Sequence, residues 1–206
     1  MIQTAIPQAE LEVFKVLKNI KIVFDVGART DTDYLEIRPK AVYHLFESNP
    51  DFFKELKEKI GNKKNVYLNN YGLSDVEENL RYSSGLQAFE SGEANKEGGD
   101  MLLPLKTLDW YVKEYNIKRI DFLKIDTEGY DYKILKGGLE TIKITKYIQY
   151  EHWDNLQQFH DLLGEEFEVE YIGYRNVLCI SRKLVNFGEC EKLKTFLHAG
   201  NYKELR

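Results

Sequence analysis

Residues 120–129 read Ile-Asp-Phe-Leu-Lys-Ile-Asp-Thr-Glu-Gly, and this stretch indicates both the fold and the place of the chemistry. It begins as an apolar strand, carries the acids Asp126 and Glu128 where the strand ends, and opens a helical pattern at Gly129. In open α/β sheets, ligands bind beyond the carboxyl ends of the strands, where acids in a pocket are costly unless they bind or catalyse. The stretch alone leaves a second interpretation open, in which solvated acids precede the positive end of a helix.

The same alternation of apolar strands and helices extends in both directions along the chain. Strands are predicted at 21–24, 41–46, 66–68, 120–126, 147–150, 167–174 and 177–181, and helices at 8–19, 50–60, 107–115, 130–141, 156–163 and 189–198. The last two strands join at Arg175-Asn176, and so short a join implies an antiparallel hairpin. The pattern predicts an α/β fold with a mostly parallel sheet, helices on both faces and one antiparallel strand.

Bulk properties narrow the class of protein. The 206 residues suit one domain, 1–206, and the net charge of −5 with a pI near 5.5 argues against a nucleic-acid partner. No apolar run approaches the ~20 residues that span a bilayer, and no signal pattern opens the chain. Cys179 and Cys190 suggest neither a disulfide framework nor a zinc site, so we expect a cytoplasmic protein. Nothing in the sequence indicates the oligomeric state.

Residues 76–104 differ from their surroundings, because they are polar, rich in Gly and Ser, and weakly periodic. A long irregular insert in a compact domain is usually functional or mobile. We therefore expect this segment to form part of the acceptor site or a lid over it.

The first predicted strand ends in Asp25-Val26-Gly27, where glycine allows the backbone to pass close to a ligand. Glu47 ends the next strand, 22 residues after Asp25, and an acid at about this spacing binds ribose hydroxyls. A dinucleotide is disfavoured, because the Gly-x-Gly-x-x-Gly pattern and the phosphate loop are both missing. A cofactor with an ammonium group, a ribose and no phosphate, such as S-adenosylmethionine, fits these residues.

Five segments, taken in order, resemble the FkbM family of S-adenosylmethionine-dependent O-methyltransferases. They are Phe24-Asp25-Val26-Gly27-Ala28, Phe46-Glu47-Ser48-Asn49-Pro50, Gly72-Leu73-Ser74-Asp75, Thr107-Leu108-Asp109 and Phe122-Leu123-Lys124-Ile125-Asp126-Thr127-Glu128-Gly129. The resemblance spans roughly residues 20–155, and the last segment is the most specific. It implies the three-layer, Rossmann-like class I methyltransferase fold, whose seven-stranded sheet ends in a pair that includes the antiparallel strand.

The resemblance also implies a set of cofactor-binding residues. Asp25 and Gly27 would lie by the methionine part, Glu47 on the ribose, and Leu73, Ser74 and Asp75 near the adenine. Ala28, Ser48 and Asp126 are further candidates for binding the cofactor. One position departs from the family pattern, because Asp31 stands where a further glycine is usual. This departure predicts weaker cofactor binding, or a non-catalytic module that keeps only the fold.

Methyl transfer to an alcohol needs a base, which contributes ~10²–10⁴-fold, or a metal that acidifies the hydroxyl. The candidates on neighbouring strand ends are Lys124, Asp126, Glu128, Glu151 and His152. We expect Asp126, Glu128 and His152 to converge in one pocket beside the donor methyl, because their two strands should be neighbours in the sheet. His152 is the preferred proton acceptor, because its ordinary pKa lies near working pH; Asp126 is the second choice. Lys124 shares the side-chain parity of Asp126, so we expect it to reach the same face and pair with a carboxylate. Alternatively, His152 is a surface histidine and Lys124 belongs to a buried ion pair. Asp126 and Glu151 could also hold a divalent cation, although a complete ligand set is not evident.

The resemblance implies an S-adenosylmethionine-dependent O-methyltransferase, and we expect it to act on a hydroxyl of a sugar in a glycan or glycosylated small molecule. The polar insert and the aromatic residues Tyr82, Phe89, Trp110 and Trp153 are suited to a carbohydrate site, although they serve ordinary packing equally well. Acceptors without a sugar, such as a protein or lipid hydroxyl, remain an alternative.

Overall fold

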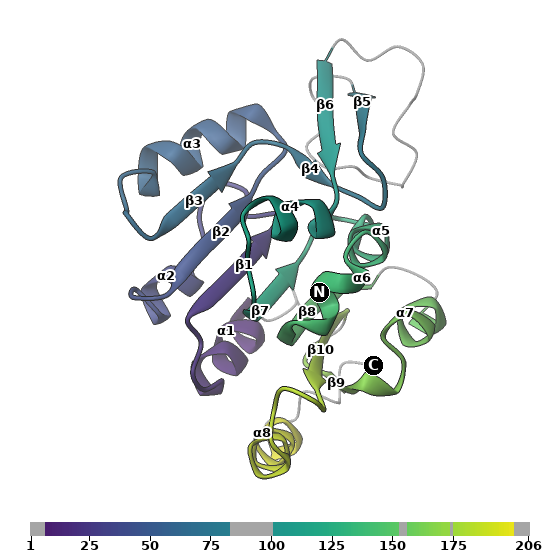
Figure 1. Cartoon of the computed structure of the whole chain (residues 1–206). Helices are drawn as coiled ribbons and strands as arrows, with labels where there is room; N and C mark the ends of the chain where they lie inside the picture. The colour runs from purple at the N-terminus through teal and green to yellow at the C-terminus, as the bar shows by residue number, and fades with distance from the viewer. Residues whose placement is uncertain (1–6, 83–100, 153–155, 174, 200–206) are drawn as a thin grey trace, which may run out of the picture.

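A seven-stranded sheet forms the centre of the computed structural model, which describes residues 7–82, 101–152, 156–173 and 175–199 (Figure 1). The strand order is β3-β2-β1-β7-β8-β10-β9. The bounds are β1 (Ile22–Val26), β2 (Val42–Phe46), β3 (Val66–Asn69), β7 (Ile120–Ile125), β8 (Thr145–Glu151), β9 (Phe167–Tyr171) and β10 (Asn176–Ser181). Only β10 runs against its neighbours in this sheet, where it pairs with both β8 and β9. The predicted fold class and the terminal hairpin are confirmed.

Helices cover both faces of this sheet (Figure 1). One face, called the α1 face here, is covered by α1 (Pro7–Val16), α2 (Tyr34–Ile37), α3 (Pro50–Ile60) and α8 (Phe187–Ala199). The opposite face, called the α4 face, is covered by α4 (Leu108–Glu114), α5 (Asp131–Lys136), α6 (Leu139–Lys143) and α7 (Leu156–Leu163). The short 3-10 helix η1 (Gly164–Glu166) follows α7. Successive strand residues alternate between two cores, so Phe122 joins the α1 core and Leu123 the α4 core. In the ranges described, no helix is long and apolar enough to cross a membrane.

Capping side chains stabilise the starts of two helices. Asn49 accepts hydrogen bonds at its Oδ1 from the backbone N–H of Asp51 (2.9 Å) and of Phe52 (3.2 Å). Thr107 Oγ1 accepts the backbone N–H of Trp110 at 3.0 Å. Both side chains satisfy N–H groups that have no partner within the helix, so α3 and α4 begin where the sequence predicts.

The predicted helix over 130–141 is instead two short helices, α5 and α6, separated by Gly137 and Gly138. A Cβ atom at Gly137 would overlap the carbonyl oxygen of Ser74, and one at Gly138 would lie 2.9 Å from Leu108 Cδ1. The chain therefore packs too closely for side chains at this break. The four-residue helix α2 was also not predicted, because four residues are too few to show a helical period.

The predicted irregular insert carries strands at both of its ends. Strands β5 (Glu78–Tyr82) and β6 (Met101–Lys106) pair antiparallel, and β4 (Gly72–Leu73) pairs parallel with β6. A small core of Leu80, Leu103 and Leu105 stabilises this second sheet. Figure 1 shows it beyond the carboxyl ends of the parallel strands. Residues 83–100, where most of the predicted lid falls, lie outside the described residues.

Candidate functional site

The turn after β1 passes unusually close to the end of β7. Gly27 has φ +83°, and a Cβ atom there would overlap the carbonyl oxygen of Asp126. The backbone N–H groups of Gly27 and Ala28 both donate to Phe46 O, at 3.0 and 3.1 Å. Glycine is therefore required at position 27, both for the left-handed backbone and for the approach of the two strand ends.

Asp31, which departs from the family pattern, does not need the conformational freedom of glycine. Its φ is not in the left-handed region, whereas that of Arg29 is, at +54°. The Asp31 carboxylate accepts the N–H of Thr32 at 2.8 Å and lies 3.7 Å from Lys59 Nζ. The loop thus places its left-handed residue at Arg29, whose guanidinium lies 5.5 Å from the centre of the Phe52 ring.

A buried ammonium joins the two strand ends. Asp25 and Lys124 are paired residues on β1 and β7, and Lys124 Nζ lies 3.1 Å from Asp25 Oδ1 and 3.5 Å from Asp126 Oδ2. The same ammonium donates to Gly27 O at 3.3 Å. Burial alone would lower the pKa of Lys124, but the charges of Asp25 and Asp126 outweigh it and raise that pKa. Lys124 therefore stays charged, and its predicted pairing with a carboxylate is confirmed.

The polar row continues on the α1 face through residues that the sequence analysis missed. Gln149 of β8 is paired with Lys124, and its Nε2 donates to the hydroxyl oxygen of Tyr34 at 3.4 Å. That hydroxyl donates to Glu10 Oε2, also at 3.4 Å. Burial raises the pKa of Glu10, and the charge of Lys124 partly offsets this effect. A glutamine within the apolar strand 145–150 was the signal in the sequence that could have indicated this row.

Glu47 is buried and holds two loops together. Its Oε2 accepts the backbone N–H of Arg29 at 2.8 Å, and its Oε1 accepts that of Asn49 at 2.7 Å. Burial raises the pKa of this carboxyl, although both backbone donors act in the opposite direction. Its position at the end of β2 is as predicted, and its contact with a ribose stays a prediction.

The segment predicted to lie near the adenine is held between β6 and α5. Leu73 is buried, the N–H of Ser74 donates to Lys106 O at 2.9 Å, and Asp75 pairs with Lys136 at 2.8 Å. The hydrogen bond from Lys136 lowers the pKa of Asp75. Ser48 adjoins this segment, because its Cβ lies 3.8 Å from where a Cβ of Gly72 would stand.

Asp131, another residue that the sequence analysis missed, fixes the loop after β7. Its Oδ2 accepts the hydroxyl and the N–H of Thr127 at 2.7 and 3.2 Å, and its Oδ1 accepts the N–H of Glu151 at 3.0 Å. Burial raises the pKa of this carboxyl to about 6. These bonds tie the loop that carries Glu128, with φ +54°, to the carboxyl end of β8.

His152 lies on the other side of the end of β8. Its backbone N–H donates to the backbone carbonyl oxygen of Arg175 at 3.0 Å. Its imidazole ring lies edge-on to the ring of Tyr171, with the ring centroids 6.4 Å apart. Burial, with a smaller effect of the Arg175 charge, lowers the pKa of His152. In the structure, Asp126 therefore contacts Lys124, whereas the ring of His152 packs against Tyr171. Convergence of His152 with Asp126 and Glu128 in one pocket stays a prediction.

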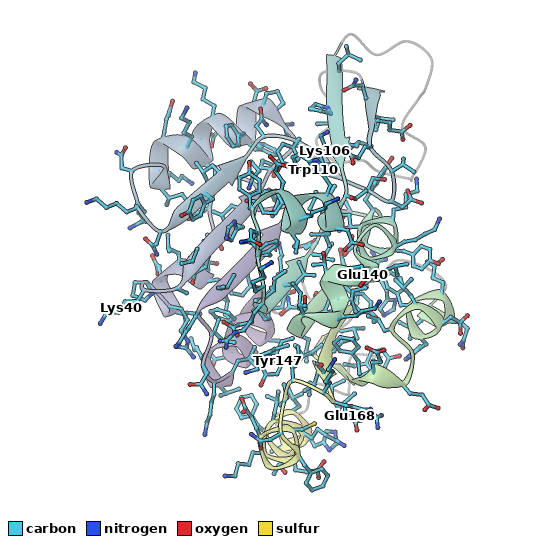
Figure 2. All side chains as sticks on the ribbon, in the orientation of Figure 1. Lys40, Lys106, Trp110, Glu140, Tyr147 and Glu168 are labelled. Atoms are coloured by element: carbon cyan, nitrogen blue, oxygen red, sulfur yellow. The ribbon has the colours of Figure 1, made fainter. Side chains whose placement is uncertain are left out.

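The described residues contain neither a set of metal ligands nor all four of the aromatic side chains that are suited to a carbohydrate. In the described part of the chain, no group of three or more His, Cys, Asp or Glu side chains is arranged to hold a metal ion. Of the four aromatic residues suited to a carbohydrate, the structure describes the side chain of Trp110 alone. Trp110 lies beside Lys106 (Figure 2), whose Nζ is 4.6 Å from the centre of its ring.

Comparisons with known proteins relate this chain to methyltransferases. The model of the Methyltransferase FkbM domain matches residues 25–175. The 2-O-methyltransferase NoeI of Sinorhizobium fredii is 21% identical over 174 residues, which cover 72% of this chain and 72% of that relative. The hexuronic acid methyltransferase AglP of Haloferax volcanii is 24% identical over 128 residues, 62% of this chain and 54% of that relative.

Solved structures show the same fold at low identity. SMU.1697c of Streptococcus mutans, in complex with SAH, superposes with a TM-score of 0.54 at 14% identity, over 88% of this chain and 99% of that chain. An rRNA methylase of Streptococcus thermophilus superposes with a TM-score of 0.52 at 11% identity, over 88% and 98%.

Proposed function

Since the chain belongs to the FkbM family of methyltransferases, we propose that it methylates a hydroxyl of a sugar, in a glycan or a glycosylated small molecule, with S-adenosylmethionine as the donor. Two relatives support a sugar acceptor, because NoeI is named a 2-O-methyltransferase and AglP a hexuronic acid methyltransferase. The net charge of −5 is unfavourable for a nucleic-acid acceptor.

The residues at the strand ends fit the proposed donor. Gln149 Oε1 and Thr32 Oγ1 are buried polar atoms without a hydrogen-bond partner in the described part of the chain, as expected beside a ligand that would complete them. The Asp25–Gly27 turn would hold the methionine part, Glu47 and Ser48 the ribose, and residues 73–75 the adenine. When bound, the donor supplies an activated methyl group on a positively charged sulfur.

Asp126 is the residue that we propose as proton acceptor. Its carboxylate stands at the carboxyl end of β7, 3.5 Å from Lys124 Nζ, and 40% of its side chain is exposed. Lys124 holds this side chain in place, and a carboxylate in that position can accept the hydroxyl proton as the oxygen attacks. His152, preferred on the sequence alone, is the competing candidate, and its lowered pKa keeps it neutral and able to accept a proton at pH 7.

One observation carries the proposal: the turn at Gly27 and the acid Asp126 touch through their backbones and share the ammonium of Lys124. The turn that we propose for the cofactor and the acid that we propose as proton acceptor therefore lie side by side at the carboxyl ends of β1 and β7. Substrates held in such a geometry gain up to ~7–11 kcal/mol from positioning.

The test is methyl transfer from labelled S-adenosylmethionine to a panel of acceptors. The panel should contain hexuronic acid glycans, neutral glycans and sugar-free alcohols, and mass spectrometry with NMR would locate the new methyl group. We expect label on a sugar hydroxyl. Label on a sugar-free hydroxyl would move the proposal to the alternative acceptor class. Failure of S-adenosylmethionine to bind in calorimetry would favour the non-catalytic module.

A further inference from the structure

One buried carboxylate joins the loop after β7 to the end of β8. Asp131 is 1% exposed, and its Oδ2 accepts the hydroxyl of Thr127 at 2.7 Å and the backbone N–H of the same residue at 3.2 Å. Its Oδ1 accepts the backbone N–H of Glu151 at 3.0 Å. Burial raises the pKa of Asp131 to about 6, so the carboxyl is mostly ionised at pH 7. Its hydrogen bonds are therefore of the strong, charge-assisted kind.

Thr127 stands between Asp126 and two residues with a left-handed backbone. Glu128 has φ +54° and Gly129 has φ +110°. A left-handed backbone strains a residue that carries a side chain, and such a conformation persists only where surrounding contacts impose it. The bonds from Thr127 to Asp131 supply such contacts, because they fix the chain immediately before the two left-handed residues.

Asp126 depends on this loop for its position. Its backbone N–H donates to Val26 O at 3.0 Å, and its carboxylate lies 3.5 Å from Lys124 Nζ. These contacts hold the end of the strand, but 40% of the side chain is exposed, and the chain leaves Asp126 in the direction that Thr127 sets. A reacting group misplaced by ~1 Å can cost ~10²-fold in rate. The loop therefore has to be held as firmly as the strand.

We propose that Thr127 and Asp131 are positioning residues for methyl transfer, because their hydrogen bond sets the place of the Asp126 carboxylate beside the acceptor hydroxyl. This inference rests on the proposed function. During transfer the acceptor oxygen forms a bond to the methyl carbon, the sulfur–carbon bond breaks with its electron pair left on sulfur, and Asp126 takes the hydroxyl proton. Thr127 and Asp131 give up no atom in this step and act through Asp126. Loss of their bond lowers the rate of the chemical step and leaves donor binding unchanged.

The chain contains a matched control for this bond. Asp109 accepts the hydroxyl and the backbone N–H of Thr141, both at 2.7 Å. The hydroxyl of Thr145, the first residue of β8, donates to Thr141 O, so this second threonine–aspartate pair lies at the opposite end of β8 from the contact with Asp131. A Thr→Val substitution in either pair deletes one hydroxyl and keeps the branched shape of the side chain.

Single-turnover transfer by the whole chain tests the inference, with labelled S-adenosylmethionine and the sugar that the wild type methylates in a panel of hexuronic acid and neutral glycans. We expect Thr127→Val to lower the rate at saturating substrates by about tenfold or more, with the dissociation constant of the donor in calorimetry within about twofold of the wild type. Thr127→Ser, which keeps the hydroxyl, should restore most of the rate. Thr141→Val should react at nearly the rate of the wild type.

A double variant shows whether Thr127 acts through Asp126. In an Asp126→Asn background, Thr127→Val should lower the rate no further, because the group that it positions is gone. Additive losses, equal losses in Thr127→Val and Thr141→Val, or a full rate in Thr127→Val or Asp126→Asn would overturn the inference and leave sugar methylation intact.

Transfer to no sugar by the wild type would instead overturn the proposed function together with this inference. Thr127→Cys covers the case in which Thr127→Val does not fold. A thiol is a weaker donor than a hydroxyl, so this variant should show a smaller loss of rate in the same direction. A full rate in Thr127→Cys would then contradict the positioning role.

Discussion

At the scale of single residues, Lys124 determines the electrostatics of the site. It is buried, and it contacts two carboxylates and one carbonyl oxygen from the ends of β1 and β7. The sequence predicted this pairing, because Lys124 and Asp126 share the side-chain parity of one strand. The contribution of Glu10 could not be predicted, since the approach of α1 to the strand ends depends on packing across the α1 face rather than on a local pattern.

Lys124→Met should destabilise the fold by ~3–5 kcal/mol, because it leaves Asp25 buried at 2% exposure without its counter-ion. Urea denaturation measures this change. Lys136→Met is the control, because Lys136 pairs with Asp75 at the surface and its loss should barely move the transition. Similar transitions for the two variants would contradict the structural role of Lys124.

His44 makes the stability of the fold depend on pH, and the direction of this dependence follows from the burial of its side chain. Burial lowers its pKa from 6.5 to about 4, and its Nδ1 lies 2.8 Å from the hydroxyl of Tyr111. Because the unfolded chain binds the proton more tightly, stability present above pH 6.5 is lost as the pH falls toward 4. The wild type should lose about 2 kcal/mol between pH 7 and pH 5 from this group, and His44→Gln should lack this component. Parallel pH profiles of urea denaturation would refute the assignment.

At the scale of the elements, the contact between β1 and β7 positions the site. The alternating strands, the capped helices α3 and α4 and the β9–β10 hairpin could be predicted, because each depends on a local signal. The break between α5 and α6 could not, since the close approach of Ser74 to Gly137 is a tertiary contact. The strand β5 was missed because it carries few apolar residues, and β6 because it contains a proline and borders a long polar segment.

Gly27→Ala should weaken binding of S-adenosylmethionine at least tenfold, because a methyl group would push β1 away from the carbonyl oxygen of Asp126. Gly164→Ala is the matched control: Gly164 also has a positive φ, +59°, but nothing lies within 4 Å of its missing Cβ. It should cost only the backbone strain of ~1–2 kcal/mol and leave binding intact. Calorimetry compares the two variants, and equal affinities would show that the close approach is not needed.

At the scale of the whole molecule, the fold gathers acids from distant segments at one edge of a sheet. Asp25, Glu47 and Asp126 lie at the ends of three adjacent parallel strands, and the order of these strands places them together. The family resemblance indicated these positions from the sequence, and the seven-stranded, mostly parallel sheet is confirmed. The side on which His152 lies depends on its packing against Tyr171 and the β9–β10 hairpin, which the strand pattern alone could not provide.

The most direct test of the account compares methyl transfer by the wild type, Asp126→Asn and His152→Ala under single-turnover conditions with a saturating labelled donor. If Asp126 accepts the proton at the ends of β1 and β7, Asp126→Asn should lower the rate by ~10²-fold or more, while His152→Ala stays close to the wild type. Calorimetry on each variant separates donor binding from chemistry. A full rate in Asp126→Asn together with a ~10²-fold loss in His152→Ala would contradict the assignment and return the role to His152.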